Sequence, residues 1–147
     1  MCLICERIEK IKNGINPYFV KELETGYVVI GDHQYFKGYT LFLCKQHKAE
    51  LFFLEDSFKE HFLKEMSLVA QAVYRAFDAN KINYELLGNS ETHLHWHLFP
   101  RKPGDMETDG PVWLVAKEKL NDAATVPTQE ELMLMKEKLN HELDLLF

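Results

Sequence analysis

The sequence lacks any apolar run long enough to span a membrane, and this absence is the first constraint on the protein. A transmembrane helix needs about 18 or more consecutive apolar residues, and no such run occurs among the 147 residues. The first residues also lack the basic stretch, followed by an apolar one, that is typical of a secretory signal. We therefore expect no membrane partner and no secretion through a recognisable signal.

Basic residues are outnumbered by acidic ones, and cysteines are few. The chain has 17 Lys and Arg against 23 Asp and Glu, which gives a formal net charge of −6. Nonspecific nucleic-acid binding needs a basic surface, so this charge argues against a nucleic-acid partner, although it leaves room for a local cationic pocket. Three cysteines, an odd number, in a chain without a signal predict a reducing compartment and hence a cytoplasmic protein.

What is present is an ordinary globular composition, with 46% apolar and 27% charged residues. A chain of this length can bury one substantial core. No internal repeat, low-complexity tract or linker divides it. The sequence therefore predicts a single domain over residues 1–147.

The most informative stretch carries three of the seven histidines at strict two-residue spacing: His93, His95 and His97. The residues that separate them are all large and apolar: Leu94, Trp96 and Leu98. Side chains on a β-strand alternate between its two faces. This alternation predicts a strand over residues 93–101, with a row of imidazoles on one face and an apolar face packed into a core.

A row of imidazoles suits covalent or acid–base chemistry. The pKa of histidine lies near neutrality, so one ring can act as a nucleophile or base while a neighbour carries or relays a proton. The attacking ring needs one free nitrogen, and an acceptor must hold its other N–H to fix the tautomer. The alternative interpretations are a solvated histidine face and a metal-binding one.

A second motif is the pair Cys2 and Cys5 at the start of the chain. Two thiolates at this spacing form the usual half of a structural zinc site. The pair is equally compatible with a redox couple or with two inert thiols. A zinc site needs two further ligands, and His47, which by default is an ordinary surface histidine, is a candidate for the third.

The hydrophobic pattern and turn residues predict an α+β fold in which an antiparallel sheet of about five strands packs against one long helix. The predicted strands are a hairpin over 18–30, then 39–44, 82–87 and 93–101, and a short strand or partner contact is expected at 113–115. The predicted helices are 6–12, a long one from Ser57 and a C-terminal one from Thr128, the last two opened by the capping boxes Ser57-x-x-Glu60 and Thr128-x-x-Glu131.

Several polar residues stand beside these elements. The loop 88–92, which includes Asn89 and Ser90, could place amide and hydroxyl groups next to the imidazole row, or could simply form a turn. Asp32 ends a predicted strand, where the sequence alone favours a turn residue over a site residue. Arg101 could contact a phosphate, although a solvated position is the default.

These residues together resemble the histidine-triad (HIT) superfamily of nucleotide hydrolases and transferases. The resemblance rests on His93-x-His95-x-His97 followed by Pro100-Arg101, on the strand that leads from Gly38 to His47, and on the amino-terminal Cys-x-x-Cys of many bacterial members. It covers roughly residues 1–104 and implies a HIT-like fold for this core. The segment 105–147 corresponds to a variable region of the family.

The resemblance implies a nucleotide substrate and a role for each matching residue. His95 would be the nucleophile that attacks the α-phosphorus and forms a nucleotidyl-histidine intermediate, which water then hydrolyses. His97 would orient and polarise the site. Asn89 and Ser90 would contact the leaving group and phosphate, and Asp32 would contact the ribose. The implied substrates are dinucleoside polyphosphates, such as diadenosine tetraphosphate, or nucleoside phosphoramidates.

The zinc-containing members of the superfamily imply further features. In them the metal would be held by the residues that correspond to Cys2, Cys5, His47 and His93, which makes a closed structural site. The resemblance also implies a homodimer. One departure from the family pattern is Tyr39, which stands where many members carry an additional histidine, so a proton relay through that position does not carry over.

Two functions of other kinds compete with this interpretation. The triad could itself bind a catalytic zinc ion, although such sites keep an open position and often include a carboxylate, which Trp96 and Leu98 do not supply. The protein could also bind nucleotides with little turnover. A trapped nucleotidyl adduct on His95, metal-dependent turnover without an adduct, and binding without turnover distinguish the three.

Overall fold

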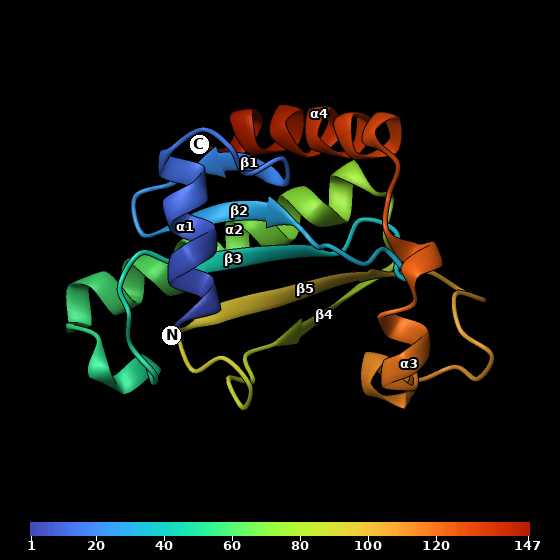
Figure 1. Ribbon diagram of the computed structural model, residues 1–147, viewed down its shortest axis with the longest axis horizontal. Coiled ribbons are helices and arrows are strands. Elements are labelled where there is room, and N and C mark those ends of the chain that lie inside the picture. Colours follow the sequence, from blue (N-terminus) through green and yellow to red (C-terminus); the bar gives the residue numbers. More distant parts are fainter.

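The computed structural model describes residues 1–147 and confirms the predicted α+β class. Five strands form one antiparallel sheet in the order β1-β2-β3-β5-β4 (Figure 1). Their bounds are β1 Phe19–Glu22, β2 Gly26–Ile30, β3 Thr40–Cys44, β4 Lys81–Glu85 and β5 His95–Arg101. The histidine strand β5 therefore lies inside the sheet, between β3 and β4.

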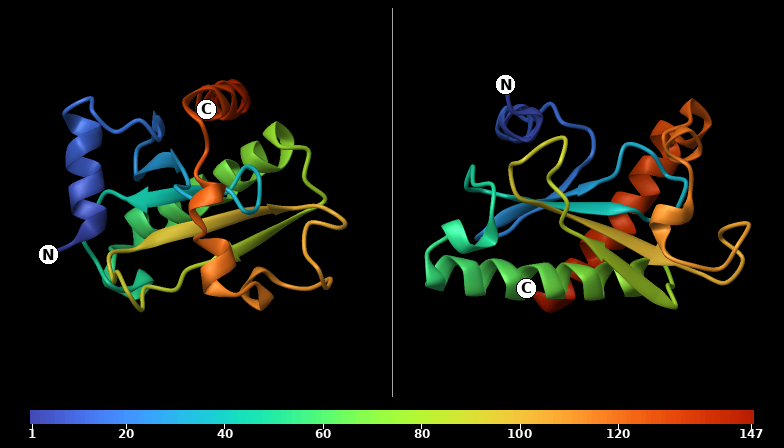
Figure 2. Two further views of the ribbon diagram at one scale, coloured as in Figure 1. Left: turned by 45° about the vertical axis from the view of Figure 1, so that its right-hand side comes forward. Right: turned by 90° about the horizontal axis from the view of Figure 1, so that it is seen from below.

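Helices cover both faces of this sheet. The α-helices are α1 Leu3–Lys12, α2 Asp56–Ala76, α3 Lys117–Leu120 and α4 Gln129–Leu146, and short 3₁₀ turns occupy Leu51–Phe53, Val112–Leu114 and Ala123–Thr125. Figure 2 shows α1 on one side of the sheet and α2 on the other. None of these helices combines the length and the apolar character that crossing a bilayer requires.

The main core lies between the sheet and the pair α2 and α4. An apolar stripe of α2 supplies Phe62, Val69 and Val73, all fully buried. From the sheet, Leu98 is buried in the same cluster and Trp96 packs against it. The apolar face of the histidine strand therefore faces α2, as the alternation predicted, and the opposite face of the sheet is left for the imidazoles.

A smaller core fixes α1 on that opposite face. Three isoleucines at three- and four-residue spacing, Ile4, Ile8 and Ile11, pack against Tyr27, Val29 and Leu43 of β2 and β3. This spacing places the three side chains on one side of the helix. The burial holds α1 across one end of the sheet and leaves the middle of the same face uncovered.

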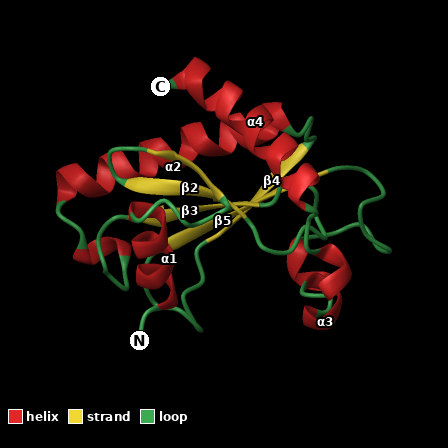
Figure 3. Cartoon of the chain, turned by 45° about the horizontal axis from the view of Figure 1, so that its top comes forward, coloured by secondary structure: helices red, strands yellow, loops and turns green.

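The segment beyond the HIT-like core is integrated into the structure. Leu132, Leu139 and Leu143 of α4 belong to the main core, and Figure 3 shows α3 near the end of the sheet that is remote from α1. Arg101 anchors the intervening loop, because its guanidinium donates to Asp105, to Asn83 and to the Gly110 carbonyl. Neither a phosphate contact nor a solvated position describes this buried arginine.

Several sequence expectations need correction. The segment 113–115, expected to be a short strand or a partner contact, is not a strand, because Val112–Leu114 form a 3₁₀ turn. The strand predicted over 82–87 ends at Glu85, and β5 begins at His95 rather than His93. His93 and Leu94 instead form the approach to β5, where the Leu94 backbone pairs with Lys48 and Cys44.

The two predicted capping boxes have different outcomes. At α4 both bonds form, since the Glu131 N–H donates to Thr128 Oγ1 and the Thr128 N–H to Glu131 Oε1. At α2 the prediction was wrong, because the helix begins at Asp56 and its N-cap is Glu55, without a side-chain bond. Ser57 therefore lies inside the first turn, where its hydroxyl is not needed as a cap.

This contrast predicts unequal effects of matched substitutions. Thr128→Ala removes a formed cap and is expected to lower the free energy of unfolding by about 1 kcal/mol. Ser57→Ala, at an exposed position without a cap bond, is expected to change it by no more than about 0.5 kcal/mol. Urea unfolding of both variants measures the difference, and equal losses would contradict the assignment of the caps.

Candidate active site and metal-binding cluster

The uncovered face of the sheet forms a cleft of about 330 Å³ between α1 and the segment that follows α3. Its floor consists of residues from β3 and β5, and its ends are formed by Leu3 and Ile4 of α1 and by Leu120 and Asn121. The titratable side chains that line it are Arg7, Asp32, His33, Tyr39, Glu85, Glu91, His95 and His97. The cleft therefore brings together two of the three triad histidines with groups from five other parts of the chain.

His95 is oriented for attack by a backbone bond. Its Nδ1 lies 2.7 Å from the carbonyl oxygen of His93, and a carbonyl can only accept, so Nδ1 carries the hydrogen. Nε2 consequently keeps its lone pair and has no hydrogen-bond partner within the protein. This bond holds the ring in the tautomer that a nucleophile requires.

His97 is held in the opposite tautomer by Tyr39. The Tyr39 hydroxyl lies 2.6 Å from His97 Nδ1 and has no other acceptor within reach. Because the hydroxyl satisfies its hydrogen only by donating to Nδ1, the hydrogen of the His97 ring resides on Nε2. Burial, with a smaller contribution from His95, lowers the pKa of His97 to about 4, so the ring is neutral at physiological pH.

The ring of Tyr39 is itself held in place from two sides. It stacks on Phe99 with the ring centroids 4.3 Å apart, and Gly31 of the neighbouring segment lies so close that a Cβ there would overlap the ring. Burial raises the pKa of Tyr39, so its hydroxyl stays protonated and available as a donor. Tyr39 thus occupies, with a fixed hydrogen bond, the position where the family resemblance implied a histidine.

Asp32 lies at the end of the cleft beside α1. Its two carboxylate oxygens accept from the two terminal nitrogens of Arg7 at 2.9 and 2.6 Å, a bidentate ion pair. Such a fork fixes both side chains in orientation. Asp32 is therefore a residue at the edge of the site rather than only a turn residue, and α1 supplies its partner.

Asn89 and Ser90 lie outside the cleft as the structure has it. Both are exposed in the loop between β4 and β5, and neither is among the residues that line the cleft. The acidic residues Glu85 and Glu91, on either side of this loop, line it instead. Strand periodicity could have indicated Glu85, which is the cross-strand partner of His97, whereas nothing in the sequence placed Arg7 or Glu91 there.

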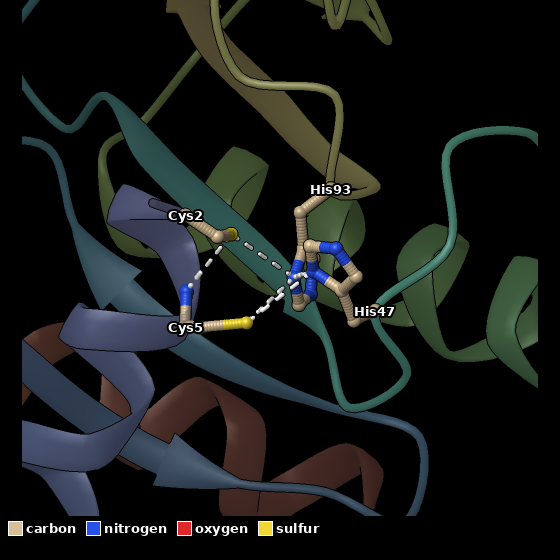
Figure 4. A group of neighbouring side chains, drawn as sticks. All are labelled: Cys2, Cys5, His47 and His93. Atoms are coloured by element: carbon tan, nitrogen blue, oxygen red, sulfur yellow. Dashed lines mark hydrogen bonds between the residues drawn. The ribbon is translucent and has the colours of Figure 1, made fainter.

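The four candidate metal ligands, Cys2, Cys5, His47 and His93, form a compact cluster. The Sγ atoms of Cys2 and Cys5 and the Nδ1 atoms of His47 and His93 all lie within 4.8 Å of one another (Figure 4). These atoms come from α1, from the segment after β3 and from the approach to β5, so the cluster joins three parts of the chain. These are the four residues that the family resemblance implied as metal ligands.

The spacing of these atoms fits one tetrahedral metal ion. With zinc at about 2.3 Å from sulfur and about 2.0–2.1 Å from nitrogen, tetrahedral sulfur and nitrogen ligands lie about 3.5 Å apart and two nitrogens about 3.4 Å apart. The Sγ–Nδ1 distances from His93 to Cys2 and to Cys5 are 3.6 and 3.5 Å, and that from His47 to Cys5 is 3.3 Å. The two Nδ1 atoms are 3.1 Å apart.

The tautomer of His93 also suits a ligand. Its Nε2 lies 2.7 Å from the carbonyl oxygen of Cys44, so Nε2 carries the hydrogen and the Nδ1 lone pair is directed into the cluster. Metal-bound histidines generally donate their second ring hydrogen to such an acceptor. Burial lowers the pKa of His93, which keeps the ring neutral, and all four ligands come from the protein, so the cluster has no open position.

The fold and the cleft define a class of α+β proteins that present a histidine row from an inner strand of an antiparallel sheet. The model of the HIT domain family matches residues 17–104, which is more than half of the chain. The chain therefore belongs to the HIT domain family, in agreement with the resemblance to nucleotide hydrolases and transferases. A comparison with curated protein sequences found no match.

Solved structures with the same fold are distant in sequence. A histidine triad protein from Marinobacter aquaeolei VT8 is 24% identical with a TM-score of 0.73, over 88% of this chain and 90% of its own. A hypothetical histidine triad nucleotide-binding protein from Sulfolobus tokodaii strain7 is 20% identical with a TM-score of 0.71, over 97% and 93%. A zinc-bound histidine triad family protein from Mycobacterium smegmatis is 21% identical with a TM-score of 0.64, over 99% and 94%.

Proposed function

We propose that the protein is a nucleotidyl hydrolase that uses His95 as its nucleophile. The observation that carries this proposal is the unpartnered Nε2 of His95, fixed by the backbone bond at Nδ1 in a cleft whose volume suits a nucleotide. Membership of the HIT domain family supports it, as does the description of the Sulfolobus tokodaii protein as nucleotide-binding. The substrates proposed are dinucleoside polyphosphates or nucleoside phosphoramidates.

The reaction divides into two displacements at the α-phosphorus. In the first, His95 Nε2 forms a bond to phosphorus while the bond from phosphorus to the leaving group breaks, which gives a nucleotidyl-histidine. In the second, water attacks the same phosphorus, the nitrogen–phosphorus bond breaks, and a nucleoside monophosphate is released. Covalent catalysis replaces one difficult step by two easier ones, and the His93 carbonyl accepts the Nδ1 hydrogen of the ring throughout.

Neighbouring residues take supporting roles in this proposal. His97 would donate from Nε2 to a phosphoryl oxygen, where fixed donors stabilise the developing charge. Asp32, oriented by Arg7, would accept from a ribose hydroxyl. Asn89 and Ser90 would reach the phosphate or the leaving group only if their exposed loop closes over the bound substrate.

Mass spectrometry tests the proposal directly. The protein is mixed with diadenosine tetraphosphate or with an adenylated amine, quenched in alkali after a short time and digested. We expect an adenylyl adduct on the peptide that contains His95, because phosphorus–nitrogen bonds of histidine survive alkaline conditions. Metal-dependent turnover without an adduct would favour a zinc hydrolase. Binding of the nucleotide without turnover would favour a nucleotide-binding protein.

The zinc hydrolase alternative has less support from the geometry. In such an enzyme the three triad imidazoles would converge on one ion. Here His93 belongs to the cluster with the two cysteines, and the bond from Tyr39 leaves the hydrogen of His97 on Nε2, so neither ring offers a lone pair beside His95. The triad is therefore divided between two tasks.

We propose that the cluster of Cys2, Cys5, His47 and His93 holds a structural zinc ion, which when bound cross-links α1 to the central strands. The match to tetrahedral spacing supports this assignment, as does the zinc-bound relative from Mycobacterium smegmatis. We also propose a homodimer. The edge strand β4 leaves backbone groups unpaired, and light scattering during gel filtration would reveal a dimer or a monomer.

The bond from Tyr39 to His97 gives a specific expectation. In Tyr39→Phe the Nδ1 of His97 loses its donor, the two neutral tautomers become mixed, and kcat is expected to fall by about tenfold, the value of one buried hydrogen bond. The ¹⁵N chemical shifts of His97 would report the mixed tautomer independently of activity. Tyr35→Phe serves as the control, because the hydroxyl of Tyr35 lies outside the cleft. Unchanged ¹⁵N chemical shifts of His97 in Tyr39→Phe would contradict the role assigned to Tyr39.

A further inference from the structure

The charge of the cleft is unusual for a site that accepts polyphosphates. Its charged residues, the histidines aside, are Arg7, Asp32, Glu85 and Glu91, and no lysine lines it. Arg7 and Asp32 neutralise one another in their ion pair. Two carboxylates therefore remain without a balancing cation in the cleft, so a ligand with several negative charges would meet repulsion.

The order of the strands separates these charges along the cleft. The ion pair of Arg7 and Asp32 lies on the β2 side of the histidine strand, because Asp32 follows β2. Glu85 lies on the other side, on β4, directly opposite His97 in the register. The nucleophile His95 stands between these two flanks. If the ribose lies on the Asp32 flank, the group that leaves the phosphorus is directed toward the Glu85 flank.

Glu85 is an acidic residue of the cleft that has no cationic partner in the protein. Its side chain lines the cleft and makes no hydrogen bond or ion pair with any protein group. Glu91, by contrast, accepts from the backbone N–H of Leu3 at the start of α1. Partial burial disfavours the charged carboxylate and raises the pKa of Glu85. A positive charge beside it would stabilise the carboxylate, and no protein group does so.

Building on the hydrolase function proposed above, we propose that Glu85 selects substrates whose leaving group is an amine with an additional positive charge. The preferred substrates are then nucleoside phosphoramidates of cationic amines, and dinucleoside polyphosphates are poor ones. In the reaction, His95 Nε2 bonds to phosphorus as the phosphorus–nitrogen bond breaks, and the departing nitrogen takes a proton from solvent. Water then displaces the histidine, leaves its hydroxyl on phosphorus and returns a proton to solvent, so that the cycle consumes one water molecule.

Three adenosine phosphoramidates that differ only in the charge of the amine test this proposal. The amines are diaminopropane, propylamine and β-alanine, which leave a positive, neutral or negative end on the leaving group. For the unmodified protein we expect kcat/KM for diaminopropane to exceed that for β-alanine by about tenfold or more, with propylamine between them. Diadenosine tetraphosphate is expected to be slower than all three.

Substitution of Glu85 then assigns the selectivity to one side chain. Glu85→Gln keeps the shape and removes the charge, so the ratio between diaminopropane and β-alanine is expected to fall to about twofold, and Glu85→Lys is expected to invert it. Glu137→Gln, the same change on the exposed side of α4, should retain the ratio of the unmodified protein. Thermal unfolding checks that each variant is folded.

The outcomes separate this inference from the proposed function. Equal rates for the three amines, an unchanged ratio in Glu85→Gln, or faster turnover of diadenosine tetraphosphate would overturn the role of Glu85 while the hydrolase stands. No turnover of any of the four substrates, together with no adduct on His95, would overturn the hydrolase itself.

Discussion

Replacement of His95 by alanine is expected to lower kcat by on the order of 10³-fold or more and to abolish the nucleotidyl adduct. The side chain supplies the attacking nitrogen. The neighbouring imidazole of His97 presents a hydrogen rather than a lone pair at Nε2, so it does not replace His95. Steady-state rates on an adenylated amine and mass spectrometry of the quenched reaction measure both effects.

Binding and folding controls make this result specific. The His95→Ala variant should bind adenosine monophosphate with nearly unchanged affinity in calorimetry, because the other residues that line the cleft remain. His95→Gly leaves space for free imidazole, which should restore part of the turnover. His141→Ala, an exposed histidine on α4, should keep full activity. A His95→Ala rate within about tenfold of the unmodified protein would remove His95 as the nucleophile.

Replacement of Cys5 by serine is expected to reduce bound zinc from about one ion per chain to nearly none and to lower the unfolding temperature. A ligand at 1,000 times its dissociation constant stabilises the folded state by about 4 kcal/mol, which corresponds to a loss of about 10 °C for a domain of this size. The three buried isoleucines of α1 should keep the rest of the fold intact. Elemental analysis and calorimetric melting measure the two effects.

The third cysteine provides the matched control for this prediction. Cys44 is buried in the main core and lies outside the cluster, so Cys44→Ala removes a thiol but should keep the zinc. A strong chelator should lower the unfolding temperature of the unmodified protein and of Cys44→Ala, but should have little effect on Cys5→Ser. Full zinc content in Cys5→Ser would show that the cluster is not the metal site.

The cluster and the cleft share α1, which connects metal binding to the proposed substrate. Cys2 and Cys5 lie at the start of this helix, and Arg7, which follows Cys5 after one intervening residue, holds Asp32 at the edge of the cleft. Loss of the cross-link would free the end of the helix that also contributes Leu3 and Ile4 to the cleft. The fall in stability of Cys5→Ser should therefore be accompanied by a higher KM, with a smaller change in kcat.

Local patterns in the sequence predicted those features that depend on periodicity. The alternation around His95 predicted which face of β5 would be polar, because side chains on a strand alternate regardless of the partners. The capping box at Thr128 was predicted for the same reason, since all of its bonds lie within four residues. The family resemblance predicted that Cys2, Cys5, His47 and His93 bind one metal ion. Only the tertiary structure shows that their ligand atoms lie close together.

Local patterns failed where several interactions compete. Ser57 matches a capping box, but α2 begins one residue before it, so the hydroxyl lies in the wrong position for a cap. Arg101 at the exit of a strand is expected to be solvated, yet three separate partners converge on it. The residues 113–115 have strand-forming side chains, but the segment bonds to β4 through the Asn83 side chain, to which the Val112 N–H donates, and Val112–Leu114 forms a 3₁₀ turn.

The sequence by itself therefore determined the α+β class and the histidine strand, because both follow from periodicity within short segments, and the family resemblance singled out His95 as the nucleophile candidate. Only the tertiary structure decided which hydrogen each imidazole carries, that Tyr39 holds His97, that Arg7 holds Asp32, and that Glu85 is left without a partner. Apart from the bond between His95 and the His93 carbonyl, these features join segments that are 25 to 58 residues apart in sequence or come from neighbouring strands. Their geometry is fixed by how the sheet and α1 pack, which no local pattern encodes.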